Sequence, residues 1–258
     1  MRDTPVCPIS VGRRALINVG NIYKRILLKL SGEALAGDRG YGFDPDTLEK
    51  IASNVIDAVD MGVQVGVVIG GGNIFRGMEA AIAADRVSAD HMGMMATIIN
   101  ALALKGSVEK MGRSAKVFSS IDMPRIAETF VASKAIEYLE ESGTAIFAGG
   151  TGCPFFTTDT TAALRALETR CDVLIKATKV NGVYDKDPVK FPDAVFYPEL
   201  DYDQVLGMKL AVMDATAISL CRDNDLMVRV INIKDPENLK QLLKGEHVGS
   251  IVRRRRDM

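Results

Sequence analysis

The sequence predicts an α/β fold whose central sheet is mostly parallel and is covered by helices on both faces. Short apolar runs alternate along the chain with longer helical patterns, which is the order of a repeated β–α unit. In sheets of this kind ligands bind at the carboxyl ends of the strands. The glycine and polar clusters of this chain do follow the predicted strands, so a binding site is expected along that edge.

The predicted elements follow from these patterns in chain order. Strands are expected at the apolar runs of residues 26–30, 63–69, 115–118, 144–148, 173–177, 227–232 and 249–252. Helices are expected at residues 45–61, 88–111, 132–142, 158–168, 201–206, 214–224 and 236–243. Asp44-Pro45 and Asp235-Pro236 each place an N-cap residue before a proline at the first helical position. Ser88 or Asp90 would cap the long central helix.

Composition excludes several classes of protein. The chain has 258 residues and a formal net charge of −1, which favours neither a nucleic-acid polymer nor an anionic membrane as partner. The one basic cluster, at residues 253–256, is expected to be a solvated tail. No apolar run reaches the length of a membrane span. Residues 1–22 lack the apolar core of a signal peptide and are expected to form a poorly ordered extension before a single domain at 23–258.

The cysteines and histidines point away from metal and redox chemistry. The four cysteines are widely spaced and form no CxxC pair, which argues against a zinc site or a disulfide framework and fits a reducing cytosol. The two histidines have no partner at the spacing of a metal site or a catalytic triad. Catalysis by histidine is therefore not expected.

Lys29 is the first candidate functional residue. It lies near the end of the apolar run 26–30 and is followed by Ser31-Gly32. An unpaired cation is rarely buried in a strand, whereas a cation beside a glycine turn with free backbone N–H groups suits a phosphate. Alternatively, the side chain snorkels out of the strand end into solvent.

A second cluster, Gly70-Gly71-Gly72-Asn73, directly follows the strand 63–69. Consecutive glycines cost folding entropy, and they suit a place where the backbone must approach a ligand closely. Arg76 follows, and its guanidinium is a bidentate phosphate donor. An anion site is favoured here over a plain turn.

Two more clusters follow strands. Residues 149–159 offer free backbone donors, the adjacent Phe155 and Phe156, and Asp159 at a helix start, where Thr157 or Thr158 would be the N-cap. The phenylalanines either stack on a base or fill the core, and Asp159 either acts in a site or interacts with the helix dipole. Residues 176–188 carry two lysines beside an Asn-Gly turn, which fit either a polyphosphate or a solvated hairpin. No P-loop or protein-kinase motif is present.

Five of these segments together resemble bacterial uridylate kinases (UMP kinases), of the amino acid kinase superfamily. They are KRILLKLSGEAL at 24–35, VGVVIGGGNIFRG at 65–77, DHMGM at 90–94, GTGCPFFTTD at 150–159 and KATKVNGVYDKDP at 176–188. The resemblance implies a three-layer αβα sandwich. It also implies transfer of the γ-phosphoryl group of ATP to UMP with Mg²⁺, in pyrimidine nucleotide biosynthesis in the cytoplasm.

The resemblance also implies roles for individual residues. Lys29, Arg76 and Asp159 would be catalytic, with Asp159 organising Mg²⁺, which the nucleotide phosphates would mostly hold. Asp214 resembles a further acidic residue near the nucleotide. ATP would contact Lys29, Ser31, Gly32, Gly72, Arg76, Thr178, Tyr184 and Asp187. UMP would contact Gly71, Asp90, Gly150, Thr151, Gly152, Cys153, Pro154, Phe155, Phe156 and Thr157.

Regulation and assembly are further implications. Family members are hexamers, often activated by GTP and inhibited by UTP, and the loop Gly37, Asp38, Arg39, Gly40, Tyr41, Gly42 matches a region tied to the GTP response. Cys153 stands where the family often has asparagine, and the spacing of 77–90 is one residue off, so Asp85 is given no role.

Two alternatives to a UMP kinase stay open at this point. One is a sister kinase acting on a small carboxylate substrate, and the other is a uridine-nucleotide sensor without turnover.

Overall fold

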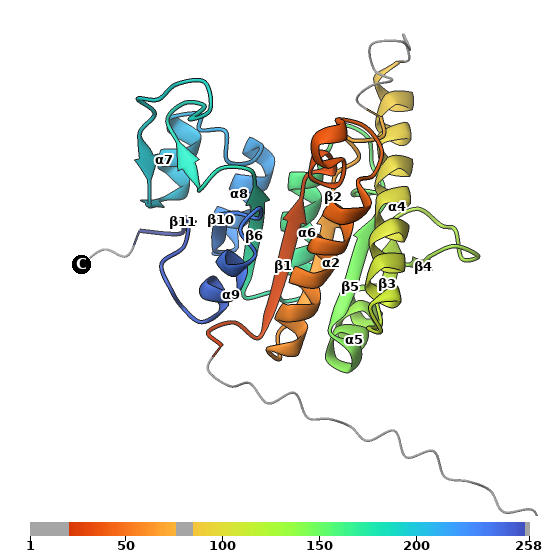
Figure 1. Cartoon of the computed structure of the whole chain (residues 1–258). Helices are drawn as coiled ribbons and strands as arrows, with labels where there is room; N and C mark the ends of the chain where they lie inside the picture. The colour runs from red at the N-terminus through yellow and green to blue at the C-terminus, as the bar shows by residue number, and fades with distance from the viewer. Residues whose placement is uncertain (1–20, 76–84, 256–258) are drawn as a thin grey trace, which may run out of the picture.

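A computed structural model gives the structure of the protein for residues 21–75 and 85–255. Its centre is a nine-stranded sheet with the order β4-β3-β5-β2-β1-β6-β10-β11-β9 (Figure 1). Every neighbouring pair is parallel except β10 and β11, which are antiparallel. The predicted α/β class with a mostly parallel sheet is confirmed.

The central strands β1 (Arg25–Leu30), β2 (Gln64–Ile69), β5 (Thr144–Ala148) and β6 (Val173–Thr178) begin and end close to their predicted bounds. The remaining strands of this sheet are β3 (Lys116–Ser119), β4 (Glu128–Thr129), β9 (Glu199–Leu200), β10 (Val228–Asn232) and β11 (Ser250–Val252). A separate antiparallel pair joins β7 (Val183–Tyr184) to β8 (Phe196–Tyr197). The two-residue strands β4, β7, β8 and β9 were not predicted, since two residues show no periodicity.

Helices cover both faces of the sheet, which gives three layers (Figure 1). One face packs against α2 (Pro45–Asp60), α4 (Arg86–Lys110) and α9 (Glu237–Leu243). The other packs against α5 (Ala132–Ser142), α6 (Thr158–Glu168), α7 (Tyr202–Gly207) and α8 (Ala215–Asp223). Strand β1 serves both cores, because Ile26 and Leu28 face the first layer and Leu27 faces the second.

Helix starts follow the predicted capping chemistry at α2 but not at α9 or α4. Pro236, not Asp235, is the N-cap residue of α9, although the Asp235 carboxylate accepts the Glu237 N–H at 3.0 Å. Asp44 caps α2 by accepting the Asp46 N–H at 3.0 Å. The prediction that Ser88 or Asp90 caps the central helix is wrong. Asp85 is the N-cap of α4, and its carboxylate accepts the N–H groups of Val87 and Ser88. This leaves the Asp90 side chain free for other partners.

Helix α4 is both long and apolar. It is the one helix of the described residues that is long and apolar enough to cross a membrane, with a mean hydropathy of 1.2 over 18 residues. The expectation that no apolar run reaches that length does not hold here. The helix packs against β2, β3, β5 and α2, and its buried side chains Ile98, Leu104 and Val108 belong to the core. Core helices commonly have this composition.

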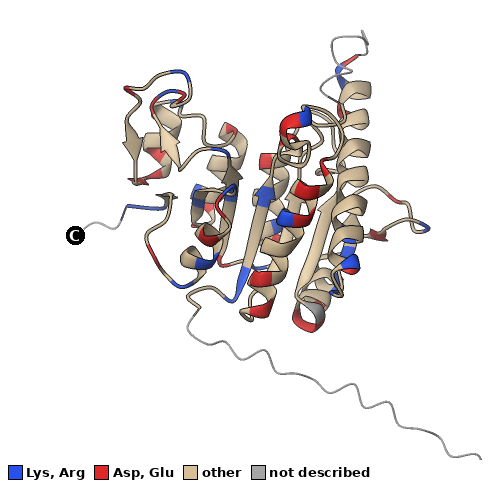
Figure 2. Ribbon diagram, in the orientation of Figure 1, with Lys and Arg blue, Asp and Glu red and all other residues tan. Residues whose placement is uncertain are grey.

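Charged residues lie mainly on the helices and loops, where Lys/Arg and Asp/Glu are intermixed in the view of Figure 2. Some basic residues lie on the strands instead, and two of them belong to the buried strand β1: Arg25 is 5% exposed and Lys29 is 7% exposed. Arg25 is paired at the amino end of the strand with Gln64, the Thr169 carbonyl and Glu140. Lys29 lies at the opposite end of the strand, where the predicted site should be.

Candidate active site

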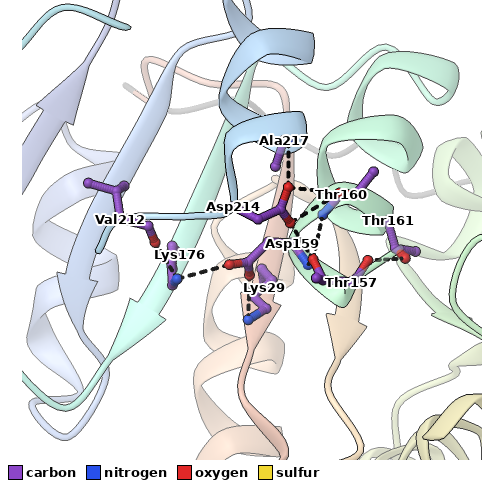
Figure 3. A network of polar contacts seen from close by, with 9 residues as sticks. All are labelled: Lys29, Thr157, Asp159, Thr160, Thr161, Lys176, Val212, Asp214 and Ala217. Atoms are coloured by element: carbon purple, nitrogen blue, oxygen red, sulfur yellow. Dashed lines mark hydrogen bonds and ion pairs between the residues drawn. The ribbon is translucent and has the colours of Figure 1, made fainter. Parts of the chain in front are cut away.

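Three charged side chains form a compact cluster at the carboxyl end of the central strands (Figure 3). Lys29 of β1 and Lys176 of β6 are register partners on adjacent parallel strands, so their side chains project side by side. Asp159, in the first turn of α6, receives both: Oδ1 lies 2.6 Å from Lys29 Nζ and Oδ2 lies 3.1 Å from Lys176 Nζ. Lys29 is therefore paired and buried and does not snorkel into solvent.

The electrostatics of this cluster keep Asp159 ionised. Burial alone would raise the pKa of the Asp159 carboxyl, but the attraction of Lys29 and Lys176 outweighs burial and lowers it. Burial, together with repulsion from Lys29, lowers the pKa of Lys176, and the Asp159 carboxylate opposes that shift. Two cations share the Asp159 carboxylate, so these three side chains carry one net positive charge, which suits an anionic ligand; Asp214 also acts on Lys176, from α8.

Asp214 supports the cluster from α8. It is the N-cap of that helix and accepts the Ala217 N–H at 2.9 Å. Its carboxylate also accepts the hydroxyl groups of Thr160 and Thr157 (Figure 3). Thr157 is in turn the N-cap of α6, which selects between the two predicted caps. The start of α6, which carries Asp159, is thus anchored to the start of α8.

The two glycine turns are packed directly against each other. A Cβ added to Gly32 would lie 2.5 Å from the Gly70 carbonyl oxygen and 2.7 Å from the Gly72 nitrogen. Any side chain at Gly32 would therefore displace backbone. Ser31, at the N-cap position of the short helix α1 (Gly32–Leu35), makes no capping hydrogen bond with its side chain. Both turns meet beside Lys29, as the prediction of a phosphate site requires.

A pocket of about 360 Å³ lies next to these turns. Five residues predicted to contact UMP line it, namely Gly71, Asp90, Gly150, Phe156 and Thr157. So do Gly72, predicted for ATP, and six residues to which the sequence assigned no ligand contact: Phe75, Ala89, Gly93, Met94, Thr97 and Thr158. The pocket thus joins the glycine turn of β2, the start of α4 and the loop after β5.

The loop of residues 149–157 is tied to α4 through Asp90. The Asp90 carboxylate accepts the Phe155 N–H at 2.6 Å and pairs with Arg86 at 2.9 Å. Thr151, Gly152, Cys153, Pro154 and Phe155 do not line the pocket. Phe155 and Phe156 are 65% and 50% exposed, so the alternative that they fill the core is wrong.

The residues predicted for the adenosine side lie beyond the lysines, around β6 and β7. Thr178 is the last residue of β6 and donates its hydroxyl to the Val180 carbonyl. Tyr184 of β7 packs against Phe196 of β8, with ring centroids 5.3 Å apart. The Asp187 carboxylate accepts the Val189 N–H. These three residues do not touch the 360 Å³ pocket, so the edge of the sheet offers two separate regions.

The loop from Gly37 to Gly42 contains a 3₁₀ turn, η1 (Gly37–Arg39), and the exposed Tyr41. Asn73 connects it to the second glycine turn: its backbone carbonyl accepts the Gly42 N–H, and its side chain donates to the Gly42 carbonyl, both at 2.8 Å. Asn73 is fully buried and is also bonded to Asn100 of α4. Arg76, predicted to be catalytic, lies outside the described residues.

The described residues contain no group of three His, Cys, Asp or Glu side chains placed to hold a metal ion. Asp159 is the one carboxylate between the two lysines, and both of its oxygens are paired with them. Mg²⁺ in nucleotide sites is held by one or two carboxylates together with substrate phosphates and waters. A Mg²⁺ ion here would therefore be held mostly by the nucleotide phosphates, and Asp159 would supply the carboxylate of the cluster.

Sequence reasoning gave too little weight to Lys176. Its motif drew attention to two lysines, but only Lys29 was assigned a central role. The sequence did carry a signal, since each lysine is the penultimate residue of its predicted strand, 26–30 for Lys29 and 173–177 for Lys176. The pairing of Asn73 with Asn100 gave no signal, because a buried amide pair depends on contacts between segments far apart in the chain.

Comparison with known proteins gives a consistent result. The family model for the amino acid kinase family matches residues 24–232. A uridylate kinase from Xanthomonas oryzae pv. oryzae is 54% identical over 234 residues, which cover 90% of this chain and 98% of that protein. Another from Xanthomonas axonopodis pv. citri is 53% identical over the same coverage.

A solved structure of UMP kinase from Bacillus anthracis matches with a TM-score of 0.86 at 40% identity, covering 90% of this chain and 96% of that one. The corresponding structure from Ureaplasma parvum has a TM-score of 0.83 at 36% identity. Both the fold and the family implied by the sequence motifs are confirmed. The chain belongs to the amino acid kinase family and, within it, to the uridylate kinases.

Proposed function

We propose that this chain transfers the γ-phosphoryl group of ATP to UMP and releases UDP and ADP. The observation that carries the proposal is the cluster of Lys29, Lys176 and Asp159, beside two glycine turns and a pocket of about 360 Å³. Such a cluster supplies positive charge where phosphates would meet. Membership of the uridylate kinases supports the choice of acceptor.

The pocket is proposed as the UMP site. Its volume falls in the range of small-ligand sites. Asp90 contributes a carboxylate that can accept from ribose hydroxyls, and Gly71 and Gly150 contribute backbone close to the ligand. ATP would lie on the other side of the lysines, with its phosphates over Gly32 and Gly72 and its adenosine toward Thr178, Tyr184 and Asp187.

Phosphoryl transfer needs little covalent chemistry from the protein, so catalysis rests on positioning and charge. An oxygen of the UMP phosphate attacks the γ-phosphorus as the bond to the β–γ bridging oxygen breaks. No base is needed, because the attacking phosphate is already an anion. Lys29 is proposed to neutralise the charge that develops on the equatorial oxygens, with Lys176 next to it. Arg76 is proposed as a further catalytic cation.

Asp159 is proposed as the organiser of the cluster rather than as a proton acceptor. Its lowered pKa keeps it ionised at neutral pH, so it can hold both ammonium groups in place. When bound, Mg²⁺ would offset charge on the nucleotide phosphates. Asp214 would act on the cluster through Thr157 and Thr160.

Assembly, regulation and cellular setting extend the proposal. A homohexamer is proposed, supported by the exposed apolar side chains Met95, Ile99 and Leu102 along α4. GTP activation through the loop Gly37–Gly42 and inhibition by UTP are proposed from the family resemblance. A cytoplasmic location and a role in pyrimidine nucleotide biosynthesis are proposed on the same basis, with residues 23–258 as one domain.

A coupled ADP-release assay tests the proposal. With ATP and Mg²⁺, UMP should give turnover, while CMP, N-acetylglutamate and carbamate should give far less. Turnover with a carboxylate substrate would favour a sister kinase, and UMP binding with no ADP release over hours would favour a sensor. Either result would contradict the proposed reaction. Adding GTP or UTP to the same assay tests regulation.

A further inference from the structure

Arg165 is a buried cation that the proposed chemistry does not use. It lies two turns after the start of α6 and is 5% exposed. Its guanidinium donates to the Ser120 hydroxyl at 2.8 Å, pairs with Glu168, and lies 3.8 Å from the centre of the Phe130 ring. Burying a charge is costly unless its partners are well placed. The contacts that compensate this buried guanidinium therefore show which part of the site Arg165 acts on.

Ser120 passes the effect of Arg165 to the loop after β5. Its hydroxyl donates to the Gly150 carbonyl at 2.7 Å. A serine hydroxyl has one proton and two lone pairs, whereas a guanidinium can only donate. With Arg165 donating to it, the hydroxyl must direct its own proton elsewhere, and the Gly150 carbonyl receives it. Hydrogen bonds in such a chain strengthen one another.

Gly150 is a wall of the 360 Å³ pocket and has a left-handed backbone, with φ of +61°. The loop also packs closely over Ser120, since a Cβ added to Gly152 would lie 3.1 Å from the Ser120 carbonyl oxygen. On its other side, the Gly149 N–H donates to Thr97 of α4 at 2.9 Å. The loop base is thus clamped between α4 and Ser120, and only the Ser120 side involves a buried charge.

Helix α6 therefore serves both halves of the site. Its first turn carries Asp159, which holds the two lysines, and Arg165 reaches from the same helix toward the loop that lines the pocket. We propose that Arg165 is a positioning residue for the acceptor: through Ser120 it fixes the Gly150 carbonyl, and with it the pocket wall. This rests on the proposed function, in which UMP occupies that pocket.

Equilibrium binding of UMP and of ATP to the full chain, measured separately by calorimetry, tests the inference. Ser120→Ala removes the hydroxyl that connects Arg165 to the Gly150 carbonyl. Loss of one neutral hydrogen bond corresponds to a loss of about twofold to tenfold in UMP affinity. Arg165→Met should weaken UMP binding at least as much, and Arg165→Lys, which keeps a donor, should restore part of it. ATP affinity should stay within about twofold in all three.

Two controls separate positioning from stability. Ser107→Ala also removes a buried serine hydroxyl, but one without a hydrogen-bond partner among the described residues, so it should not change UMP affinity. Glu168→Gln removes the salt-bridge charge beside Arg165 and leaves Ser120 in place. It should lower the melting temperature without weakening UMP binding.

The double variant Ser120→Ala/Arg165→Met gives the decisive comparison. If Arg165 and Ser120 act through the same series of hydrogen bonds, the double variant should bind UMP as tightly as the single variant with the lower UMP affinity. Three results would overturn the inference: fold-losses in UMP affinity that multiply in the double variant, equal losses of affinity for UMP and for ATP, or an unchanged UMP affinity in Ser120→Ala. Wild-type turnover on UMP is a separate readout: if it is absent while UMP still binds, the proposed function fails and the binding test still applies.

Discussion

Replacing Lys29 by methionine separates the catalytic role of its charge from its role in the fold. The side chain is 9% exposed, and its ammonium lies 2.6 Å from Asp159 Oδ1. Methionine has a similar length and adapts to irregular space, so the stem should still be accommodated. Asp159 keeps Lys176 at 3.1 Å, and the repulsion between the two lysines disappears. No buried carboxylate is left unpaired.

The expected change in stability is therefore small. Volume-conserving substitutions cost less than about 1.5 kcal/mol, and for a chain of this size that lowers the melting temperature by roughly 3–6 °C. The catalytic effect should be much larger. Loss of one preorganised group that stabilises transition-state charge costs on the order of 10²–10³ in kcat, or about 2.7–4 kcal/mol.

The assay is ADP release at saturating ATP and UMP, with the melting temperature of the same preparation measured in parallel. We expect kcat to fall by that factor while the protein stays folded. A variant with kcat within a few-fold of the parent would show that Lys29 does not carry the transition-state charge. A collapse of the melting temperature would show that the ion pair serves the fold instead.

Three further predictions concern Asp159, the glycine turns and the cysteines. Asp159→Asn leaves two buried lysines without their carboxylate, so unfolding free energy at pH 7 should fall by about 3 kcal/mol, a drop of roughly 6–12 °C in melting temperature. Because the pKa of Asp159 is lowered in the folded state, its contribution to the free energy of unfolding is present above the unfolded pKa of about 3.9 and is lost as pH falls through the folded value. Urea titrations from pH 6 to 2 should therefore show that the free energy of unfolding falls less steeply with acid in Asp159→Asn than in the parent. Parallel curves would contradict the pairing. Gly32→Ala should destabilise the fold, since its Cβ would lie 2.5 Å from a backbone oxygen. Gly72→Ala, whose Cβ would have no atom nearer than 3.7 Å, should keep its melting temperature and raise KM for ATP. Equal melting temperatures of the two variants would refute the contact at Gly32. Burial raises the pKa of the Cys171 and Cys221 thiols to about 12, so at pH 8 a thiol reagent should label exposed Cys153 in the native protein and spare those two, as peptide mapping by mass spectrometry can check.

The order of elements was predictable from sequence because buried parallel strands are short apolar runs and helices carry capping signals. Predictions failed where tertiary contacts decide. Asp85 rather than Ser88 or Asp90 caps α4. All three are residue types that suit an N-cap, and the position at which the backbone becomes helical decides between them. Strands of two residues, such as β4, exist only because a neighbouring strand pairs with them.

The candidate site was predictable in part for the same reason. Motifs at strand ends identified Lys29, Asp159 and the glycine turns, because a parallel sheet gathers strand ends on one edge. Which lysine pairs with which carboxylate depends on register between β1 and β6, which no local pattern reveals. The chain from Arg165 to Ser120 to Gly150 joins three segments far apart in sequence, and each residue alone is unremarkable.

The register of Lys29 against Lys176 also constrains how this gene can change over time. Successive side chains of a strand point to opposite faces, so inserting or deleting one residue before Lys29 within β1 would turn the lysine into the opposite helix layer and bring a leucine to Asp159. Substitutions in β1 can be accommodated one at a time, but a change in its length cannot. Descendants of this chain should therefore vary in the length of their surface loops while the spacing from Arg25 to Gly32 stays fixed.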